Sequence, residues 1–251
     1  MRRLMKSVKE VITSPFELLR KFNSAIGQGE VHLYACKLDP GSERINYLET
    51  LLSEQEKKNV SFFSFEKDQI AYTASQGFLR LVVAFYLDID GSEVKFAKHR
   101  KGKPYLLNDT SLLYNISNSG DYVIIGISRH GEIGIDLEKI RPLDDFEDLV
   151  HKNFTPRERE YIVKVPTETI NRFFKLWTLK EAFLKAIGEG MRLTPDNLEF
   201  LIENGKFKLH TGPGFYEFDD WHFSDITIGN NYLGSLAHMK NPVYVSEIRY
   251  L

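Results

Sequence analysis

Alternation between hydrophobic and polar residues predicts a strand soon after residue 30. Residues 31–38 alternate with strand periodicity, and Asp39-Pro40-Gly41-Ser42 interrupts the pattern. A helix with a capping box is expected after Ser53, because Glu56 stands three residues further on. Apolar residues at helical spacing then predict a longer helix over residues 67–87, followed by short strands at 94–96, 112–117, 123–128 and 133–138.

The second half of the chain repeats this order of a long helix and short strands. Thr155-Pro156-Arg157-Glu158 predicts a helix start, with a capping residue, a proline at the first position and an acid in the first turn. A long helix over residues 168–187 follows, and Gly188 and Gly190 end it. Further strands are expected at 198–202, 206–210, 226–228, 232–237 and 243–248.

The repeated order divides the chain into an N-terminal extension and two lobes. The lobes span residues 31–130 and residues 131–251, and together they predict an α+β fold. The extension, residues 1–30, is basic and lacks the continuous apolar centre of a secretory signal. It fits contact with a membrane surface, an organelle address, a loose N-terminal extension, or an over-long start assignment, since Met5 is also available as a start.

Composition narrows the class of protein without indicating a reaction. Of the 251 residues, 42% are hydrophobic and 27% are charged, as in ordinary globular proteins. The 33 basic and 35 acidic residues nearly balance, so we predict that nucleic acid is not a partner. A single cysteine, Cys36, excludes an internal disulfide and a cysteine-based zinc site, and it favours a reducing, cytoplasmic location. No run approaches the roughly 18 apolar residues of a membrane span, so we predict no transmembrane segment.

Two acidic residues share one face of the predicted strand at 133–138. Because side chains alternate on a strand, Asp136 and Glu138 point one way, while the alternating Ile133, Ile135 and Leu137 point into the core. Neighbouring carboxylates repel each other, and a divalent ion that binds both removes this cost. Oxygen ligands favour a hard ion such as Mg²⁺. The alternative is a solvated face, which many antiparallel sheets have.

A third acidic residue lies within the apolar face of the second long helix. At about 100° per residue, Glu181 falls in the same arc as Phe174 and Trp177, and Lys185 follows one turn later. An unpaired charge that faces the core is costly, so we predict that Glu181 pairs with Lys185, with a metal, or with both. The alternative is a solvated Glu–Lys pair, but the polar face of this helix is expected across Asn171, Lys175 and Thr178.

Two polar segments complete the candidate residues. Lys98-His99-Arg100-Lys101-Gly102-Lys103-Pro104 is a compact basic loop, whose lysines and free amide groups suit phosphates. Tyr114-Asn115-Ile116-Ser117-Asn118-Ser119-Gly120 ends a strand in small hydrogen-bonding residues, which fits either an ordinary turn or a polar cradle for a ligand. Three acids, a lysine and a basic loop together suit a metal-bound pyrophosphate.

In order and spacing, these motifs resemble those of the Sfp-type 4′-phosphopantetheinyl transferases. The motifs are Gly102-Lys103-Pro104, Asn115-Ile116-Ser117-Asn118-Ser119, Gly134-Ile135-Asp136-Leu137-Glu138 and Trp177-Thr178-Leu179-Lys180-Glu181-Ala182-Phe183-Leu184-Lys185. The resemblance runs from about residue 31 to the C-terminus. It implies a monomer whose two α+β lobes are related by a pseudo-twofold axis, with coenzyme A bound between them.

The resemblance also implies a reaction and a set of site residues. Enzymes of this kind move the 4′-phosphopantetheine arm of coenzyme A onto a serine of an acyl or peptidyl carrier protein and release 3′,5′-ADP. Glu181 would help to deprotonate the serine, and Lys185 would neutralise charge on the phosphates and could protonate the leaving group. The implied ligands are Asp136, Glu138 and Glu181 for Mg²⁺, and Lys103, Ser117 and Asn118 for the nucleotide phosphates.

One position departs from the family pattern. Asn118 stands where the family usually has a histidine that contacts the 3′-phosphate of the nucleotide. An asparagine donates hydrogen bonds but carries no charge. We therefore expect weaker binding of coenzyme A, unless a residue of the basic loop (His99, Arg100 or Lys101) substitutes. The basic residues of the family's first helix are matched only loosely, by Lys57 and Lys58.

Two other functions compete with this interpretation. Paired acids with a lysine also describe a two-metal phosphodiesterase or nuclease, although the chain lacks a broad basic surface with interleaved aromatic residues. A non-catalytic relative that binds coenzyme A or a carrier protein is the second alternative. Asn118 favours this second alternative, and the presence of all three acids with Lys185 argues against it.

Overall fold

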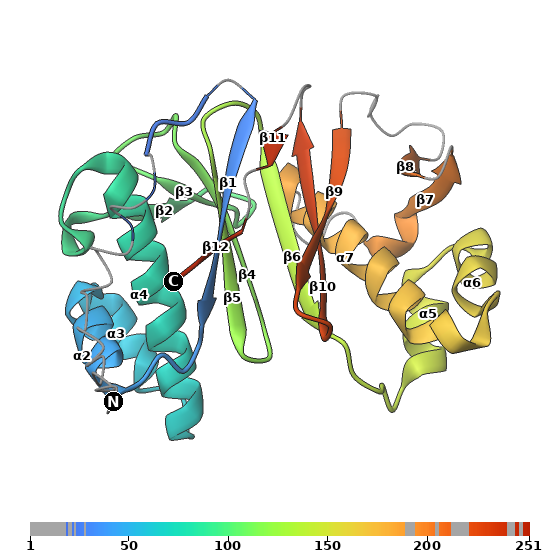
Figure 1. Ribbon diagram of the computed structural model, residues 1–251, viewed down its shortest axis with the longest axis horizontal. Coiled ribbons are helices and arrows are strands. Elements are labelled where there is room, and N and C mark those ends of the chain that lie inside the picture. The colour runs from blue at the N-terminus through green and yellow to red at the C-terminus, as the bar shows by residue number, and fades with distance from the viewer. Residues whose placement is uncertain are drawn as a thin grey trace, which may run out of the picture.

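Two β-sheets pack face to face between two long helices, α4 and α7 (Figure 1). The structure is a computed structural model that describes residues 19, 22, 24–27, 29–188, 194–203, 206–211, 221–239, 244–245 and 248–251. Most of the predicted extension, residues 1–30, lies outside this described part, as does Gly190.

The first lobe places three antiparallel strands on one face of α4. β5 pairs with β1 on one side and with β4 on the other. Tyr34, Ile125 and Ile127 point from this sheet into the core that it shares with α4. The elements are β1 (Glu30–Lys37), α2 (Ser42–Leu51), α3 (Glu54–Val60), α4 (Glu66–Leu87), a 3₁₀ turn (Gly91–Glu93), β2 (Phe96–Lys98), β3 (Pro104–Leu106), β4 (Leu113–Ser119) and β5 (Tyr122–Ser128).

The second lobe is built in the same way around α7. β10 pairs with β6 and with β9, and residues such as Phe183 and Ala186 pack α7 onto this sheet. The elements are β6 (Ile133–Lys139), α5 (Phe146–Asn153), α6 (Pro156–Val163), a 3₁₀ turn (Pro166–Glu168), α7 (Thr169–Ile187), a 3₁₀ turn (Pro195–Asn197), β7 (Leu198–Glu203), β8 (Lys206–Thr211), β9 (Trp221–Ile228) and β10 (Tyr232–Met239).

The two lobes follow one plan. Each begins with a strand, continues through helices to the long helix, and then forms a short hairpin and two more strands. The sheet orders β1-β5-β4 and β6-β10-β9 correspond strand by strand. A third core lies between the two sheets, where Leu33 and Ile124 meet Ile135 and Leu236. The predicted α+β fold with two similar lobes is therefore confirmed.

The last described strands belong to the first lobe. β11 (Tyr244–Val245) and β12 (Arg249–Tyr250) both pair in parallel with β1, along the edge that β5 leaves free. Arg249 donates a hydrogen bond to the Tyr34 hydroxyl at 2.6 Å, which fastens β12 to that sheet. The boundary that placed all of residues 131–251 in the second lobe is thus wrong for these strands, because an open sheet edge recruits chain from elsewhere.

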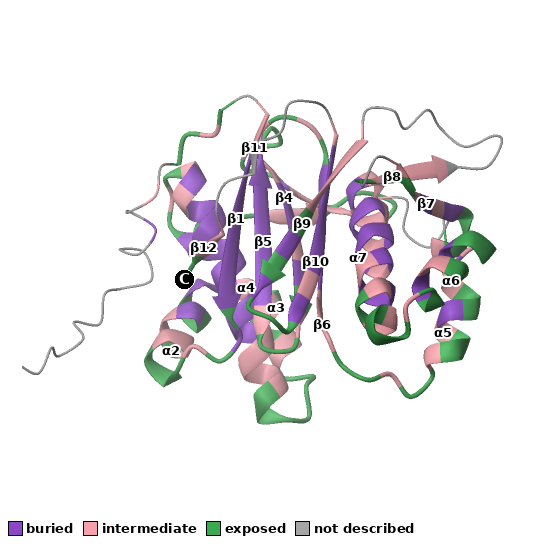
Figure 2. Ribbon diagram, turned by 45° about the vertical axis from the view of Figure 1, so that its right-hand side comes forward, coloured by how far each residue is buried: buried purple, intermediate pink, exposed green. Residues whose placement is uncertain are grey.

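The hydrophobic pattern predicts the buried elements better than the exposed ones. The central strands are buried, whereas α2 and α3 are largely exposed (Figure 2). α2 was not predicted, because it buries only Leu48 and Leu51. By length and composition α4 alone among the described helices is apolar enough to cross a membrane, but 67% of its most apolar window is buried inside the protein, as in a core helix.

Candidate active site

Side chains of β4 join the two lobes by hydrogen bonding to the backbone of β6. The Asn115 side-chain oxygen accepts from the Ile135 amide at 2.9 Å, Ser117 Oγ accepts from the Leu137 amide at 3.2 Å, and Ser119 Oγ accepts from the Lys139 amide at 2.9 Å. Of the two alternatives for this polar run, an ordinary turn does not hold before Gly120, because β4 continues through Ser119 and its alternate side chains accept from the amides at the edge of β6.

A glycine at the start of the acidic strand lets α7 approach β6 closely. A Cβ atom on Gly134 would clash with the Ala182 carbonyl oxygen and the Ala186 amide nitrogen, and it would lie 2.8 Å from Ala186 Cβ. The backbone of α7 therefore rests directly on β6 at this point. Because Glu181 lies next to Ala182 and Lys185 next to Ala186, the contact brings both side chains to the acidic strand.

Asp136 is the most deeply buried of the three acids, with 4% of its surface exposed. Its Oδ1 atom accepts hydrogen bonds from Lys185 Nζ at 2.7 Å and from Ser117 Oγ at 3.1 Å. Its Oδ2 atom is buried and has no hydrogen-bond partner among the described residues. Burial raises the pKa of Asp136 above its ordinary value, although the ammonium group of Lys185 opposes this effect. One carboxylate oxygen of Asp136 is thus buried without a hydrogen-bond partner among the described residues, at a residue that lines the cavity described below.

Glu138 and Glu181 are half-buried beside Asp136. Burial is the main cause that raises the pKa of each group, and the charge of Asp136 raises both further. Ser119 Oγ donates to Glu138 at 2.7 Å, whereas Glu181 forms no hydrogen bond or ion pair with any described residue. Three carboxylates that oppose one another's ionisation form a site that favours a cation.

Of the two partners predicted for Glu181, a metal and Lys185, the structure corrects Lys185. Lys185 forms its ion pair with Asp136 rather than with Glu181. Glu181 also does not face the core, because the deeply buried side of α7 carries Phe183 and Lys180 while Glu181 lies on a more open side. Thr178, expected on a polar face, is buried and shares a 2.9 Å hydrogen bond with Ser235 of β10.

Two cavities meet at Glu181 and Lys185. The first, of about 430 Å³, is lined by the three acids and by residues of α4, and we call it the acidic cavity. Its walls are formed by Ser75, Gln76, Ile116, Ser117, Asn118, Asp136, Glu138, Trp177, Glu181 and Lys185. The second, of about 830 Å³, runs from Glu181 and Lys185 to Lys103 of the basic loop and to Thr194 and Pro195. The predicted site residues therefore surround one continuous region between the lobes.

The basic loop lies against the end of α7. It connects β2 and β3, and Gly102 adopts a positive φ of 97° there. The Lys103 side chain crosses over Gly188, and its ammonium group bonds to the Glu132 carboxylate and the Ala186 carbonyl. Lys103 is thus held at the cavity wall by protein groups.

Two residues of α4 also line the acidic cavity, and the sequence did not indicate them. Ser75 exchanges hydrogen bonds with the exposed Asn118 side chain, at 3.0 and 3.1 Å, and Gln76 lies beside it on the cavity wall. The available signal was a polar Ser75-Gln76 pair that interrupts the apolar run of the long helix. The contact places α4 of the first lobe within reach of the acids of the second.

The donor set suits a hard divalent cation. Among the described residues no group of three or more His, Cys, Asp or Glu side chains is arranged so that it could hold a metal ion. However, the unpartnered Oδ2 atom of Asp136 and the mutual repulsion of three carboxylates are what a bound cation would relieve. Oxygen donors with a neighbouring lysine define a candidate site for phosphoryl-group chemistry.

Sequence comparisons identify the family. The family model described as the 4′-phosphopantetheinyl transferase superfamily matches residues 132–237, and the one described as 4′-phosphopantetheinyl transferase, N-terminal, matches residues 37–130. The 4′-phosphopantetheinyl transferase HetI of Nostoc sp. is 32% identical over 219 residues, which cover 86% of this chain and 90% of that protein. The chain therefore belongs to the 4′-phosphopantetheinyl transferases, and the resemblance of its motifs is confirmed.

Two further comparisons are consistent with this assignment. The 4′-phosphopantetheinyl transferase gsp of Aneurinibacillus migulanus is 32% identical over 164 residues, covering 63% of this chain and 65% of that protein. The L-aminoadipate-semialdehyde dehydrogenase-phosphopantetheinyl transferase of Xenopus laevis is 27% identical, over 74% of this chain and 70% of that protein.

Proposed function

We propose that this protein transfers the 4′-phosphopantetheine arm of coenzyme A to a serine of an acyl or peptidyl carrier protein and releases 3′,5′-ADP. The observation that carries the proposal is the convergence of Asp136, Glu138, Glu181 and Lys185 on one region between the lobes. The assigned family gives the group transferred, and the carboxylates with their lysine suit a pyrophosphate.

Coenzyme A is proposed to occupy the 830 Å³ cavity, with its pyrophosphate near Lys185. The proposed partners of the nucleotide phosphates are the Lys103 ammonium group and Asn118, which line these cavities. Mg²⁺, bound by Asp136, Glu138 and Glu181, would neutralise pyrophosphate charge. The buried, unpartnered oxygen of Asp136 supports this ligand set.

The protein side chains then account for the movement of protons. The serine hydroxyl attacks the phosphorus that bears the pantetheine arm, and the bond from that phosphorus to the bridging oxygen of 3′,5′-ADP breaks. Glu181 accepts the serine proton, a role that suits a carboxylate whose pKa burial has raised. Lys185 can return a proton to the departing phosphate, and its contact with Asp136 keeps its side chain directed at the site.

We also propose that the protein acts as a cytoplasmic monomer. Its one cysteine is buried and unpaired, as expected in a reducing compartment. Each lobe contributes residues to the site, so one chain supplies all the proposed groups. Sedimentation equilibrium across a range of concentrations tests this, and a dimer mass would contradict it.

Release of 3′,5′-ADP tests the reaction and its alternatives together. The purified protein is incubated with coenzyme A, Mg²⁺ and an apo carrier protein, and the products are separated by chromatography. We expect 3′,5′-ADP only when all three additions are present. Release without the carrier would indicate a phosphodiesterase, and no release with several carriers would indicate a non-catalytic relative.

Mg²⁺ should raise the thermal stability of the protein, and the carboxylates of Glu138 and Glu181 should determine how large the increase is. The pKa values of Glu138 and Glu181 are raised in the folded protein, so between the unfolded and folded pKa values the folded state holds more protons. Their contribution to the free energy of unfolding therefore falls as the pH rises through that window, and Mg²⁺ should restore it at neutral pH. A tenfold excess over Kd would add about 1.4 kcal/mol.

Differential scanning calorimetry at pH 7.5 and pH 5 measures this effect. The increase in Tm with Mg²⁺ should be larger at pH 7.5, because protons compete with the metal at the lower pH. An E138Q/E181Q variant is the control and should lose most of the increase. An equal increase in the variant would remove these two carboxylates from the proposed metal site.

The exposed asparagine gives a prediction about affinity. Replacing Asn118 by His should lower the KM for coenzyme A several-fold, because a histidine can place positive charge beside a phosphate, whereas the uncharged Asn118 side chain bonds to Ser75. The KM is measured at pH 6.0 and pH 8.0, and the decrease should be larger at pH 6.0. An unchanged KM at both would mean that a residue of the basic loop already supplies the charge.

A further inference from the structure

A buried lysine lies next to the proposed base on α7. The Lys180 side chain is 1% exposed, and its Nζ atom lies 2.6 Å from Glu158 Oε2. The same ammonium group lies 2.9 Å from the Asn153 carbonyl oxygen and 2.8 Å from those of Pro195 and Leu198. Three N–H donors therefore serve four acceptors, which come from three separate segments of the second lobe.

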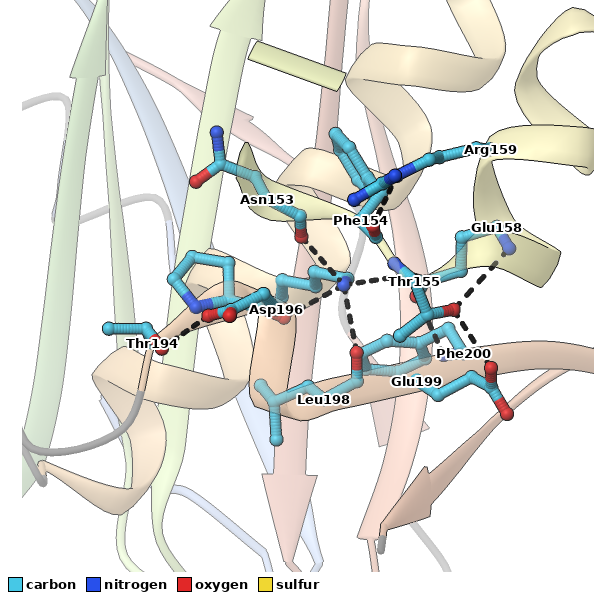
Figure 3. A network of polar contacts seen from close by, with 12 residues as sticks. Asn153, Phe154, Thr155, Glu158, Arg159, Thr194, Asp196, Leu198, Glu199 and Phe200 are labelled. Atoms are coloured by element: carbon cyan, nitrogen blue, oxygen red, sulfur yellow. Dashed lines mark hydrogen bonds and ion pairs between the residues drawn. The ribbon is translucent and has the colours of Figure 1, made fainter. Parts of the chain in front are cut away.

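The partner of this lysine is itself fixed from several sides. Glu158 is fully buried, and its Oε1 atom accepts from the Phe200 amide at 2.8 Å. Its Oε2 atom also accepts from the Thr155 amide at 2.9 Å, in the capping box that begins α6. Figure 3 shows these groups converging from the start of α6 and from the chain around β7, with Thr155 also bonded to Glu199.

Stability alone does not account for this arrangement. Removing two charges from water costs free energy that their attraction seldom exceeds, and apolar pairs of similar volume commonly stabilise as well. Hydrogen bonds from one ammonium group to several carbonyl oxygens differ from apolar packing in one respect, because they fix the positions of those carbonyls. The network therefore holds residues 195–198 at a defined distance from α7.

The fixed segment forms part of the larger cavity. Thr194 and Pro195 line the 830 Å³ cavity opposite the basic loop, together with Glu181 and Lys185 of α7. Pro195 thus belongs both to the cavity wall and, through its carbonyl oxygen, to the contacts of Lys180. The distance between this wall and α7 depends on the lysine that joins them.

We propose that Lys180 is a positioning residue, which holds the Pro195 wall against α7 at the separation that coenzyme A requires. The inference rests on the proposed function, because it takes coenzyme A as the occupant of this cavity. Lys180 lines neither of the two cavities, and α7 is held independently by the Gly134 contact with β6. Loss of the lysine should therefore act on binding of coenzyme A more than on the chemical step.

The test compares two variants that differ only at the lysine. E158Q keeps the contacts of Lys180 with the three carbonyl oxygens, whereas K180M/E158Q removes them and leaves no unpaired buried charge. Relative to E158Q, the double variant should raise the KM for coenzyme A about tenfold, while kcat changes by less than about threefold. Equal KM values in the two variants, or a fall in kcat alone, would overturn the proposal.

Two further measurements keep the result clear. Circular dichroism melting of both variants shows whether they are folded at the assay temperature. If the double variant is not folded, K180R/E158D takes its place, because it keeps the ion pair with an altered geometry. This variant should still raise the KM for coenzyme A with little change in kcat. An unchanged KM in K180R/E158D would also overturn the proposal. Wild-type protein is assayed alongside the variants. Absence of transfer by wild type would reject the proposed function. Normal transfer by wild type, with equal KM values in E158Q and K180M/E158Q, would reject only the role of Lys180.

Discussion

Replacing Glu181 by Gln should lower kcat/KM about 10³-fold, within the range that a positioned acid or base contributes, without lowering the free energy of unfolding. Glu181 forms no hydrogen bond or ion pair with a described residue, so the change removes no native contact. It does remove a charge that the site disfavours, because burial and the charge of Asp136 raise the pKa of Glu181 against the opposing attraction of Lys185. Activity and stability should therefore change in opposite directions, as expected where a site holds mutually repelling groups for function.

The matched control is Asp136→Asn. This variant should also abolish transfer, but Asp136 accepts from both Lys185 and Ser117, so the protein should remain folded with a lower Tm. Steady-state kinetics and calorimetry on the two variants separate the roles. Substantial transfer by either one would remove that residue from the proposed machinery, and a large loss of stability in Glu181→Gln would show that the glutamate has a structural partner.

Replacing Gly134 by Ala should nearly eliminate activity and lower the free energy of unfolding by about 3 kcal/mol, because an added methyl group must displace closely packed backbone. The atoms that the new Cβ would meet are the Ala182 carbonyl oxygen and the Ala186 amide nitrogen. Neither belongs to a flexible side chain, so α7 itself must move. Glu181 and Lys185 would move with it, away from the acids of β6.

Gly229→Ala is the control for Gly134→Ala, because it introduces backbone strain without a close contact. Gly229 lies in the turn between β9 and β10 with a positive φ of 56°, and nothing lies within 4 Å of an added Cβ. The left-handed conformation costs an alanine about 1 kcal/mol, so this variant should lose a little stability and retain full transfer. Full transfer by Gly134→Ala would contradict the claim that its contact positions the helix.

The sequence was sufficient to predict which residues share the site but not how they pair. Strand alternation placed Asp136 and Glu138 on one face, and the structure puts both on the acidic cavity with Glu181. The helical arc placed Glu181 near Lys185, yet the lysine bonds to Asp136, because the approach of α7 to β6 decides which groups meet. Periodicity gives the direction of a side chain within one element and contains no information about the neighbouring element.

The contacts between segments distant in sequence explain the other differences. The polar residues of β4 are indistinguishable from turn residues until β6 is placed beside them, with its amides directed at Ser117 and Ser119. Lys180 likewise lies at the edge of the apolar arc in the sequence, whereas its partner Glu158 comes from another helix. Both sets of contacts join segments that are distant in the sequence, so the pattern within one segment does not predict them.

Mass spectrometry of an apo carrier protein tests the central claim most directly. The carrier is incubated with coenzyme A, Mg²⁺ and either wild-type protein or the Glu181→Gln variant, and its intact mass is measured over time. The account predicts that wild type adds one phosphopantetheine group to the serine of the carrier and that the variant adds almost none. An unchanged carrier mass with wild type, across fatty-acid, polyketide and nonribosomal-peptide carriers, would contradict it.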